Sequence, residues 1–252
     1  MDDFLPFCEQ QIWSTRGTRV FFIRYHDTTS GIHLRLRFKG EPDWLDKTLQ
    51  PAFDKAFKKK GTWTIATYEP EIARFGGDIG MAWAEEYFHI SSRVALSRLK
   101  TKDYTYGDAM FDALRLHLST VFATGLNKTE SGKYFETLGS EWIKAFFKPL
   151  EGDEQMDLIT TVRADFEETY HPQSEFLKDA LNQFHLSLTE ERFDAKQPEW
   201  LRWLKGNQLI FKEMGPELTT RNLPHLLHLT NNRLGINNQD EAYLLYVLSK
   251  VF

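Results

Sequence analysis

Two short runs of residues around a glycine-containing turn limit what the N-terminal third of the chain can become. Residues 20–25 are β-branched and aromatic, and residues 33–38 alternate strictly between apolar and basic side chains. The polar segment 27–31 lies between them, and this arrangement predicts a β-hairpin. Side chains alternate between the two faces of a strand. One face of the second run therefore carries Leu34, Leu36 and Phe38, and the other carries His33, Arg35 and Arg37.

The segment after the hairpin adds a helix and a further strand to this prediction. Residues 44–60 have apolar side chains at helical spacing and end in a lysine run before Gly61, which is a plausible helix stop. Residues 62–68 are rich in threonine and aromatic residues, which predicts a third strand. We therefore expect a small antiparallel or mixed sheet with a helix on one face.

From residue 79 onward, apolar residues recur three and four positions apart, which predicts helices. The helices are expected over residues 81–99, 107–124, 132–147, 153–170, 175–188, 218–233 and 239–252. The breaks between helices contain Gly125, Pro149, Pro172 and Pro198. Because no linker rich in Ser, Gly or Pro separates the halves, we predict an α+β fold in one domain. It spans residues 1–252, with a sheet-containing part over 1–78 and a mainly helical part over 79–252.

Charge and cysteine content exclude several classes of protein. The chain has 31 basic and 36 acidic residues, a net charge of −5, so it lacks the overall basic character of a duplex nucleic-acid binder and no direct DNA contact is expected. Its single cysteine, Cys8, excludes an internal disulfide and a cysteine-rich zinc site. The longest apolar run, 242–248, is too short to span a bilayer, and the acidic N-terminus is unlike a signal peptide. A cytoplasmic protein without membrane insertion is expected.

The first candidate site is the row formed by His33, Arg35 and Arg37. Cationic groups on one strand face repel one another unless an anion lies among them, and the arginine fork suits carboxylate or phosphate. Arg24, on the partner strand, is expected to join the row. The alternative is a solvated outer face.

The second candidate is the segment 68–77, which directly follows the predicted third strand. Glu71 and Arg74 are three residues apart and face the same way on a helical turn, while Gly76 and Gly77 allow a sharp turn or close approach to a ligand. The alternative is a surface ion pair at the start of a helix.

The third candidate is the segment 225–233. On a helix, His225 and His228 share a face with Asn232, a spacing similar to that of metal ligands. However, no HExxH motif and no neighbouring cysteine accompany them, so no metal is predicted. A neutral histidine near an arginine is better suited to proton transfer. A packed or surface histidine is the alternative.

Together, four spaced motifs resemble one known family. They are Phe21-Phe22-Ile23-Arg24-Tyr25, His33-Leu34-Arg35-Leu36-Arg37-Phe38, Tyr68-Glu69-Pro70-Glu71 with Arg74-Phe75-Gly76-Gly77, and His228-Leu229 with Asn232-Arg233-Leu234. In this order they look like the thiopeptide-type bacteriocin biosynthesis domain, the stand-alone form of the C-terminal glutamate-elimination domain of class I lanthipeptide dehydratases. The resemblance runs from about Val20 to the C-terminus.

The resemblance implies an enzyme of RiPP (ribosomally made, post-translationally modified peptide) biosynthesis. It would expel glutamate from glutamylated Ser or Thr of a precursor peptide, leaving dehydroalanine or dehydrobutyrine. A separate protein that uses glutamyl-tRNA would supply the glutamylated peptide. No cofactor is implied. The resemblance assigns catalysis to Arg35, Arg37, Arg74 and His228, and we assign substrate binding to Arg24, His33, Glu71, Asn232 and Arg233.

Two alternatives to elimination follow from the same resemblance. Stand-alone relatives in thiopeptide pathways join two dehydroalanines in a formal four-plus-two aza-cycloaddition, which forms a pyridine. A non-catalytic peptide-binding subunit is the third reading. One departure from the family concerns the sheet, because only about twenty residues precede Phe21 and contain no strong strand. We therefore expect either a shorter sheet or a sheet edge completed by another chain, as in a homodimer.

Overall fold

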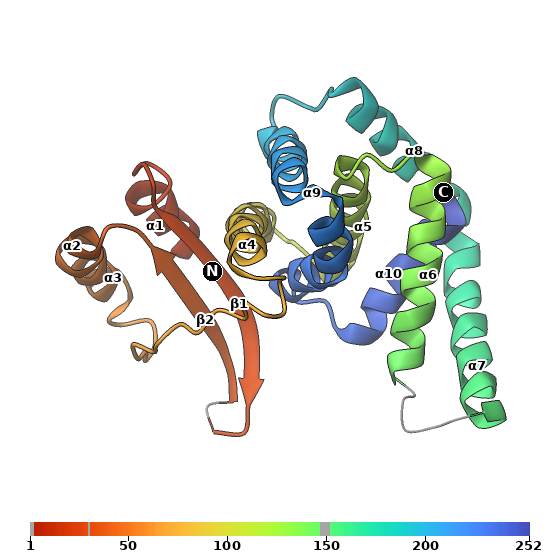
Figure 1. Cartoon of the computed structure of the whole chain (residues 1–252), viewed down its shortest axis with the longest axis horizontal. Coiled ribbons are helices and arrows are strands. Elements are labelled where there is room, and N and C mark those ends of the chain that lie inside the picture. Colours follow the sequence, from red (N-terminus) through yellow and green to blue (C-terminus); the bar gives the residue numbers. More distant parts are fainter. Residues whose placement is uncertain (1–2, 30, 147–151) are drawn as a thin grey trace.

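The computed structural model describes residues 3–29, 31–146 and 152–252. Helix α1 (Phe4–Gln11) precedes a hairpin of β1 (Arg19–Asp27) and β2 (Gly31–Lys39), which form a two-stranded antiparallel sheet (Figure 1). A continuous helical stretch follows, consisting of α2 (Pro42–Trp44), the π-helical η1 (Leu45–Leu49) and α3 (Gln50–Phe57). The remaining elements are α4 (Asp78–Leu99), α5 (Tyr106–Ala123), α6 (Lys128–Phe146), α7 (Gly152–Tyr170), η2 (His171–Gln173), α8 (Ser174–Glu190), α9 (Pro198–Leu234) and α10 (Asn238–Val251). The predicted α+β class, with a small sheet before a larger helical part, is confirmed.

The third strand predicted over residues 62–68 is wrong. The segment forms no strand, and its side chains are exposed until Tyr68. Aromatic contacts at its two ends explain its path: Trp63 lies 5.6 Å from the ring of Phe53 on α3, and Tyr68 lies 5.8 Å from the ring of Phe21 on β1. These contacts hold the segment against side chains of neighbouring elements, so its backbone does not align with β2.

The predicted helices are present, with differences in extent. Helix α9 begins twenty residues before the predicted start of 218, and it is interrupted at Gly215, whose φ of 72° and ψ of 170° are not helical. Pro216 follows the interruption, so the two halves of α9 are joined across a kink. Helix α1 was not predicted. The break predicted at Pro149 and the predicted helix end at residue 147 lie outside the described residues.

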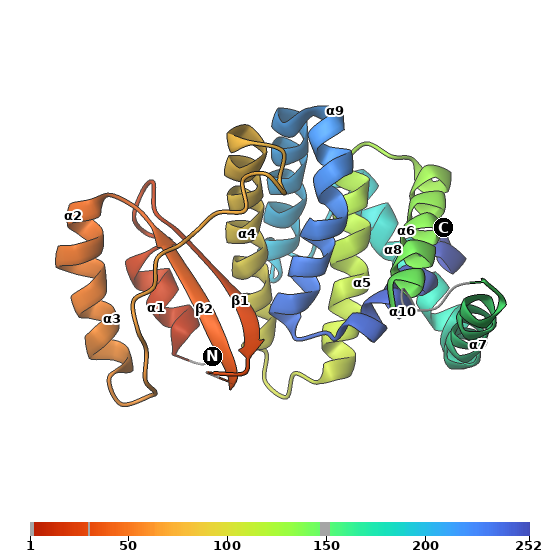
Figure 2. The same ribbon diagram turned by 60° about the horizontal axis from the view of Figure 1, so that its bottom comes forward.

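Helices α4 and α9 pack side by side at the centre of the molecule, and α4 lies between the hairpin and the helices that follow α4 in the chain (Figure 2). Their contact is aromatic and closely packed: Tyr87 on α4 lies 5.2 Å from Trp203 on α9, and both side chains are buried. The Tyr87 hydroxyl is 2.9 Å from Thr230 Oγ1. Among the described residues, no helix combines the length and apolar character needed to cross a membrane.

The outer edge of β1 is closed by side chains of α4. The Val20 N–H donates to Nδ1 of His89 at 3.2 Å, and the Phe22 N–H donates to Oγ of Ser92 at 3.1 Å. Buried backbone groups need partners, and a neighbouring strand normally supplies them. Here helix side chains replace that strand.

Helix α9 continues the same closure one step along β1. The Arg24 N–H donates to Oδ1 of Asn232 at 2.8 Å, and Nδ2 of Asn232 donates back to the Arg24 carbonyl at 2.9 Å. The amide thereby pairs with the backbone as another peptide group would. The expectation that another chain completes the sheet edge is therefore wrong for β1, because this chain supplies the partners itself.

The outer edge of β2 is open by comparison. In the register of the hairpin, Leu34 and Leu36 oppose Arg24 and Phe22, so their backbone groups also point outward. Within the described part of the chain, no other backbone segment hydrogen-bonds to this edge, although Nη1 of Arg37 donates to the Leu36 carbonyl at 3.0 Å. Ile32 is 87% exposed beside it.

Candidate active site

The predicted arginine row lies on one face of the hairpin. Residues directly opposite each other in an antiparallel pair share a face. Phe21 opposes Arg37, and Ile23 opposes Arg35. Arg24 opposes Leu34 and therefore lies on the other face, so it does not join the row as expected. Its Nε donates to the backbone carbonyl of Arg233 at 3.2 Å.

Arg35 is held by its neighbours on the hairpin. Its guanidinium carbon lies 3.3 Å from the centroid of the Tyr25 ring, and Nη2 is 3.8 Å from a carboxylate oxygen of Asp27. Its Nε is 3.4 Å from Nε2 of His33, whose Nδ1 is 3.0 Å from the Gly31 carbonyl. The cation–π contact and these loose polar contacts orient Arg35 while leaving its side chain 36% exposed. His33 contacts Arg35 and the turn.

Arg37 contacts a tyrosine to which the sequence analysis gave no role. Its guanidinium carbon is 5.3 Å from the ring centroid of Tyr68. Burial and then the charge of Arg35 lower the pKa of Arg37, while burial and the nearby Glu85 carboxylate raise the pKa of Tyr68. Glu85 accepts a hydrogen bond from Nζ of Lys39 at 2.7 Å. Tyr68 therefore remains protonated at neutral pH, and the only signal for it in the sequence was its place in the resembling motif.

Glu71 and Arg74 form the ion pair expected from their spacing. Nη1 of Arg74 lies 3.0 Å from both carboxylate oxygens of Glu71. The Arg74 and Glu71 side chains are 52% and 60% exposed, so solvent screens the pair. The guanidinium is thus held in place but remains available to an incoming anion.

Helix α9 holds the loop that carries this pair. Nη2 of Arg221 donates to the Ala73 carbonyl at 2.7 Å, and Nδ2 of Asn222 donates to the Phe75 carbonyl at 3.1 Å. The loop then turns into α4 so tightly that a Cβ at Gly80 would lie 1.8 Å from the Phe75 carbonyl oxygen. Position 80 therefore requires a glycine, because the backbone of Phe75 lies so close to it. The sequence analysis singled out Gly76 and Gly77 and did not predict this requirement at Gly80.

His228 pairs with a buried carboxylate that the sequence analysis missed. Nδ1 of His228 lies 2.9 and 3.0 Å from the two carboxylate oxygens of Glu241, on the first turn of α10. Glu241 is only 2% exposed, and burial raises its pKa, opposed by the contact with His228. The ring of Trp142 lies 5.8 Å from the imidazole. No sequence pattern links residues 228 and 241, because the contact depends on where the chain places the first turn of α10 in the folded protein.

This carboxylate determines which nitrogen of His228 is free. A carboxylate accepts a hydrogen bond, so Nδ1 of His228 carries the proton and Nε2 keeps its lone pair in the neutral ring. The side chain is 36% exposed. A base oriented by a carboxylate in this way is well placed to take a proton from a bound ligand. The described residues contain no group of three or more His, Cys, Asp or Glu arranged to hold a metal ion.

His225 lies between the loop and His228. Its ring is 6.1 Å from that of Phe75, and burial, then Arg74, then His228 lower its pKa. The pKa of Tyr68 likewise responds to both Arg37 and Glu71. These electrostatic neighbours link the candidate groups into one set, hereafter the charged row. Its members are Arg35, Arg37, Tyr68, Glu71, Arg74, His225, His228 and Glu241.

Asn232 and Arg233 lie beneath β1, where all their side-chain polar atoms except Nη2 of Arg233 bond within the protein. Both groups of the Asn232 amide bond to the backbone of Arg24. Arg233 is fully buried, donating to Oγ of Ser92 at 3.0 Å and to the Leu229 carbonyl at 2.7 Å. Burial lowers the pKa of Arg233 to about 9. These contacts support the hairpin, and substrate binding by Asn232 and Arg233 stays a prediction.

The chain is similar to known proteins along its whole length. The family model described as the C-terminal part of lantibiotic biosynthesis dehydratases matches residues 1–252. The tRNA-dependent lantibiotic dehydratase MibB from Microbispora sp. 107891 is similar in structure, with a TM-score of 0.66 and 21% identity over 99% of this chain. The chain spans only 26% of MibB. No curated protein matches the chain.

Two further solved structures are similar along most of their own length. TsrL has a TM-score of 0.65 and 15% identity, covering 98% of this chain and 87% of TsrL. The pyridine synthase TbtD from thiomuracin biosynthesis has a TM-score of 0.62 and 14% identity, covering 99% of this chain and 92% of TbtD. At these identities the likenesses show a shared fold.

Proposed function

Since the chain belongs to the family of lantibiotic biosynthesis dehydratase C-terminal domains, as its four motifs predicted, we propose that it expels glutamate from glutamylated Ser or Thr of a precursor peptide. The product is dehydroalanine or dehydrobutyrine. The observation that carries the proposal is the pairing of His228 with buried Glu241 within the charged row. Such a row combines a base for a carbon acid with cations for a departing carboxylate.

His228 is the base in this proposal. Its Nε2 takes the α-proton of the acylated residue, the C–H electron pair becomes the Cα=Cβ double bond, and the Cβ–O bond breaks. The imidazolium that forms lies 2.9 Å from the Glu241 carboxylate, which stabilises the new charge. The departing glutamate takes the bonding electrons as a carboxylate, so atoms and charge balance.

The arginines are assigned to the negative charges of the glutamyl group. Arg37 and Arg35 on the hairpin and Arg74 on the loop present guanidinium groups that bind carboxylates through paired hydrogen bonds. Glu71 orients Arg74 through the 3.0 Å contacts and also suits the glutamyl ammonium group. A separate glutamylation protein that uses glutamyl-tRNA would supply the substrate.

A pyridine-forming cycloaddition is the second candidate. It is favoured by the likeness to the pyridine synthase TbtD, of which this chain covers 92%. A proton-transfer group and oriented cations also serve that reaction. An experiment must therefore use a different substrate for each candidate to distinguish the two. The third candidate is a non-catalytic peptide-binding subunit. It gives no role to the buried Glu241 that pairs with His228.

The test supplies purified protein with a glutamylated precursor peptide and, separately, with a linear peptide carrying two dehydroalanines, and follows both by mass spectrometry. Loss of glutamate from the first peptide supports elimination, whereas ring formation with release of the leader from the second supports cycloaddition. His228→Gln and Arg37→Gln should each reduce elimination by about 10²–10⁴-fold. Arg163→Gln, which removes an exposed cation on α7, is the matched control. An intact ester with folded protein contradicts elimination, whereas parental elimination rates in both variants contradict the assignment of His228 and Arg37 to the reaction.

A further inference from the structure

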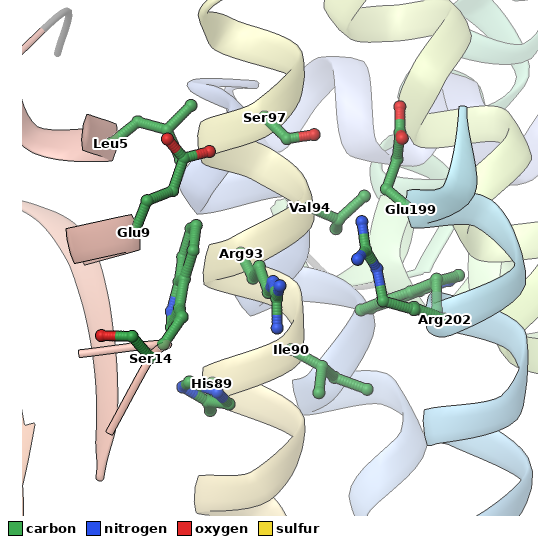
Figure 3. Close-up of a pocket in the computed structure, with 12 residues that line it drawn as sticks. Leu5, Glu9, Ser14, His89, Ile90, Arg93, Val94, Ser97, Glu199 and Arg202 are labelled. Carbon is green, nitrogen blue, oxygen red and sulfur yellow. The ribbon is translucent and has the colours of Figure 1, made fainter. Parts of the chain in front are cut away.

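A cavity lies on the other side of α4 from the charged row. It has a volume of about 520 Å³ and is bounded by α1, α4 and the first half of α9 (Figure 3). On α4, Phe88 faces Phe21 and Phe75 near the row, whereas His89 and Arg93 line the cavity. Cavities of this size hold ligands larger than a single amino acid.

Two arginines enter this cavity from different helices. The side chains of Arg93 on α4 and Arg202 on α9 project into the same space (Figure 3). Within the described part of the chain, neither forms an ion pair, although other surface arginines such as Arg192 do. Burial and then the charge of Arg202 lower the pKa of Arg93, and the charge of Glu9 only partly opposes them. Two guanidinium groups that repel each other are stabilised by an anion between them.

The other residues that line the cavity indicate which chemical groups a ligand would carry in addition to its anion. The ring of Trp13 lies 4.6 Å from the guanidinium carbon of Arg93, and Ile90 and Val94 provide apolar surface beside it. Glu9, from α1, and Glu199, from α9, also line the cavity (Figure 3), and Glu199 is already paired with Arg98 at 3.5 Å. A carboxylate there accepts hydrogen bonds from N–H groups and disfavours a polyphosphate or nucleic-acid backbone.

We propose that this cavity binds an acidic peptide segment, with a side-chain carboxylate between Arg93 and Arg202, an apolar neighbour against Trp13 and Ile90, and a ligand N–H donated to Glu9. The cavity would thus recognise a peptide away from the groups assigned to chemistry. The site does not depend on whether the charged row eliminates glutamate. A free amino acid with two carboxylates shares part of this chemistry, so the experiment separates the two ligands.

The experiment measures fluorescence anisotropy of a labelled, N-acetylated peptide Leu-Glu-Glu-Leu binding to the full chain. The matched probe is Leu-Gln-Gln-Leu, and free glutamate is the competitor. We expect the acidic peptide to bind at least tenfold more tightly than the Gln peptide. Arg93→Gln and Arg202→Gln should each weaken binding about tenfold or more, while Arg192→Gln on the exposed turn after α8 should not.

Each outcome decides the proposal. Equal binding of the two peptides, or parental affinity in Arg202→Gln, overturns it. Binding of free glutamate without binding of the acidic peptide also overturns the assignment to a peptide. Because Arg93 is half-buried, its variant is checked by thermal unfolding, and the exposed Arg202 provides the result that does not depend on folding.

Discussion

The outer edges of β1 and β2 carry the same backbone groups, but the groups on the two edges differ in their hydrogen-bond partners. On β1, side chains of α4 and α9 accept the outward N–H groups of Val20, Phe22 and Arg24. On β2, the outward groups beside Leu34 meet no other backbone segment among the described residues. The comparison teaches that helices can close a sheet edge without adding a strand. It also predicts that substitutions at the two edges differ sharply in their effect on stability.

The largest effect is expected from Asn232→Ala. It leaves both the N–H and the carbonyl of Arg24 without partners, which should lower the free energy of unfolding by about 3 kcal/mol. Urea unfolding followed by circular dichroism measures this loss. Asn238→Ala, at an exposed position at the start of α10, is the control and should change the value by less than about 0.5 kcal/mol. A loss below about 1 kcal/mol in Asn232→Ala would show that the amide does not close the edge.

A smaller loss, about 2 kcal/mol, is expected from Ser92→Ala. The change removes the acceptor of the Phe22 N–H and of Nε of buried Arg233. Ser91→Ala provides a matched control, because Ser91 is equally buried but donates only to the Phe88 carbonyl of its own helix. Equal losses in the two alanine variants would contradict the proposed closure of β1.

The β1 edge should also weaken in acid. Burial lowers the pKa of His89 below its ordinary value of about 6.5, opposed by the Val20 carbonyl and Glu86. Between the lowered pKa of His89 in the folded protein and its ordinary pKa in the unfolded chain, the unfolded chain binds more protons. Stability therefore falls as pH falls below about 6.5. Unfolding free energies at pH 7.5 and 5.5 measure the fall, which His89→Gln should reduce. Part of the acid-induced loss of stability persists in His89→Gln, because burial also lowers the pKa of His117, to about 4. An unchanged difference between the two pH values in His89→Gln would contradict this.

The smallest effect is expected on the open edge. Leu34→Lys places a charge at a position whose side chain is 45% exposed. On the side away from β1, its backbone has no strand partner among the described residues, so the free energy of unfolding should change by less than about 0.5 kcal/mol. The same urea titration measures it. A loss above about 1 kcal/mol would show that the β2 edge is covered in solution, as a homodimer would require.

Local patterns were sufficient to predict most of the fold. The alternation of residues 33–38 and the helical spacing from residue 79 each correspond to an observed element. The third strand was mispredicted because the composition of residues 62–68 favours a strand, while the contacts of Trp63 and Tyr68 hold the backbone elsewhere. The early start of α9 was missed because no single apolar periodicity spans a helix that is interrupted at Gly215.

The candidate site was predicted as far as local spacing reaches. Spacing predicted the Glu71–Arg74 pair and the shared face of Arg35 and Arg37, both of which the structure contains. Glu241 was missed because its partner lies on another helix. Arg24 was placed on the wrong face because the phase of β1 relative to β2 depends on the pairing register, which the residues of β1 alone do not determine.

The closed edge has a consequence for which side chains the hairpin shows to a substrate. Only even-numbered residues of β1 turn their N–H groups toward His89, Ser92 and Asn232. A shift of β1 by one position would present odd-numbered amides instead and would rotate the whole strand by half a turn. The three helix side chains therefore select the orientation of the hairpin. Through the pairing of β1 with β2 they place Arg35 and Arg37 on one face, where Arg35 contacts Tyr25 and Arg37 contacts Tyr68.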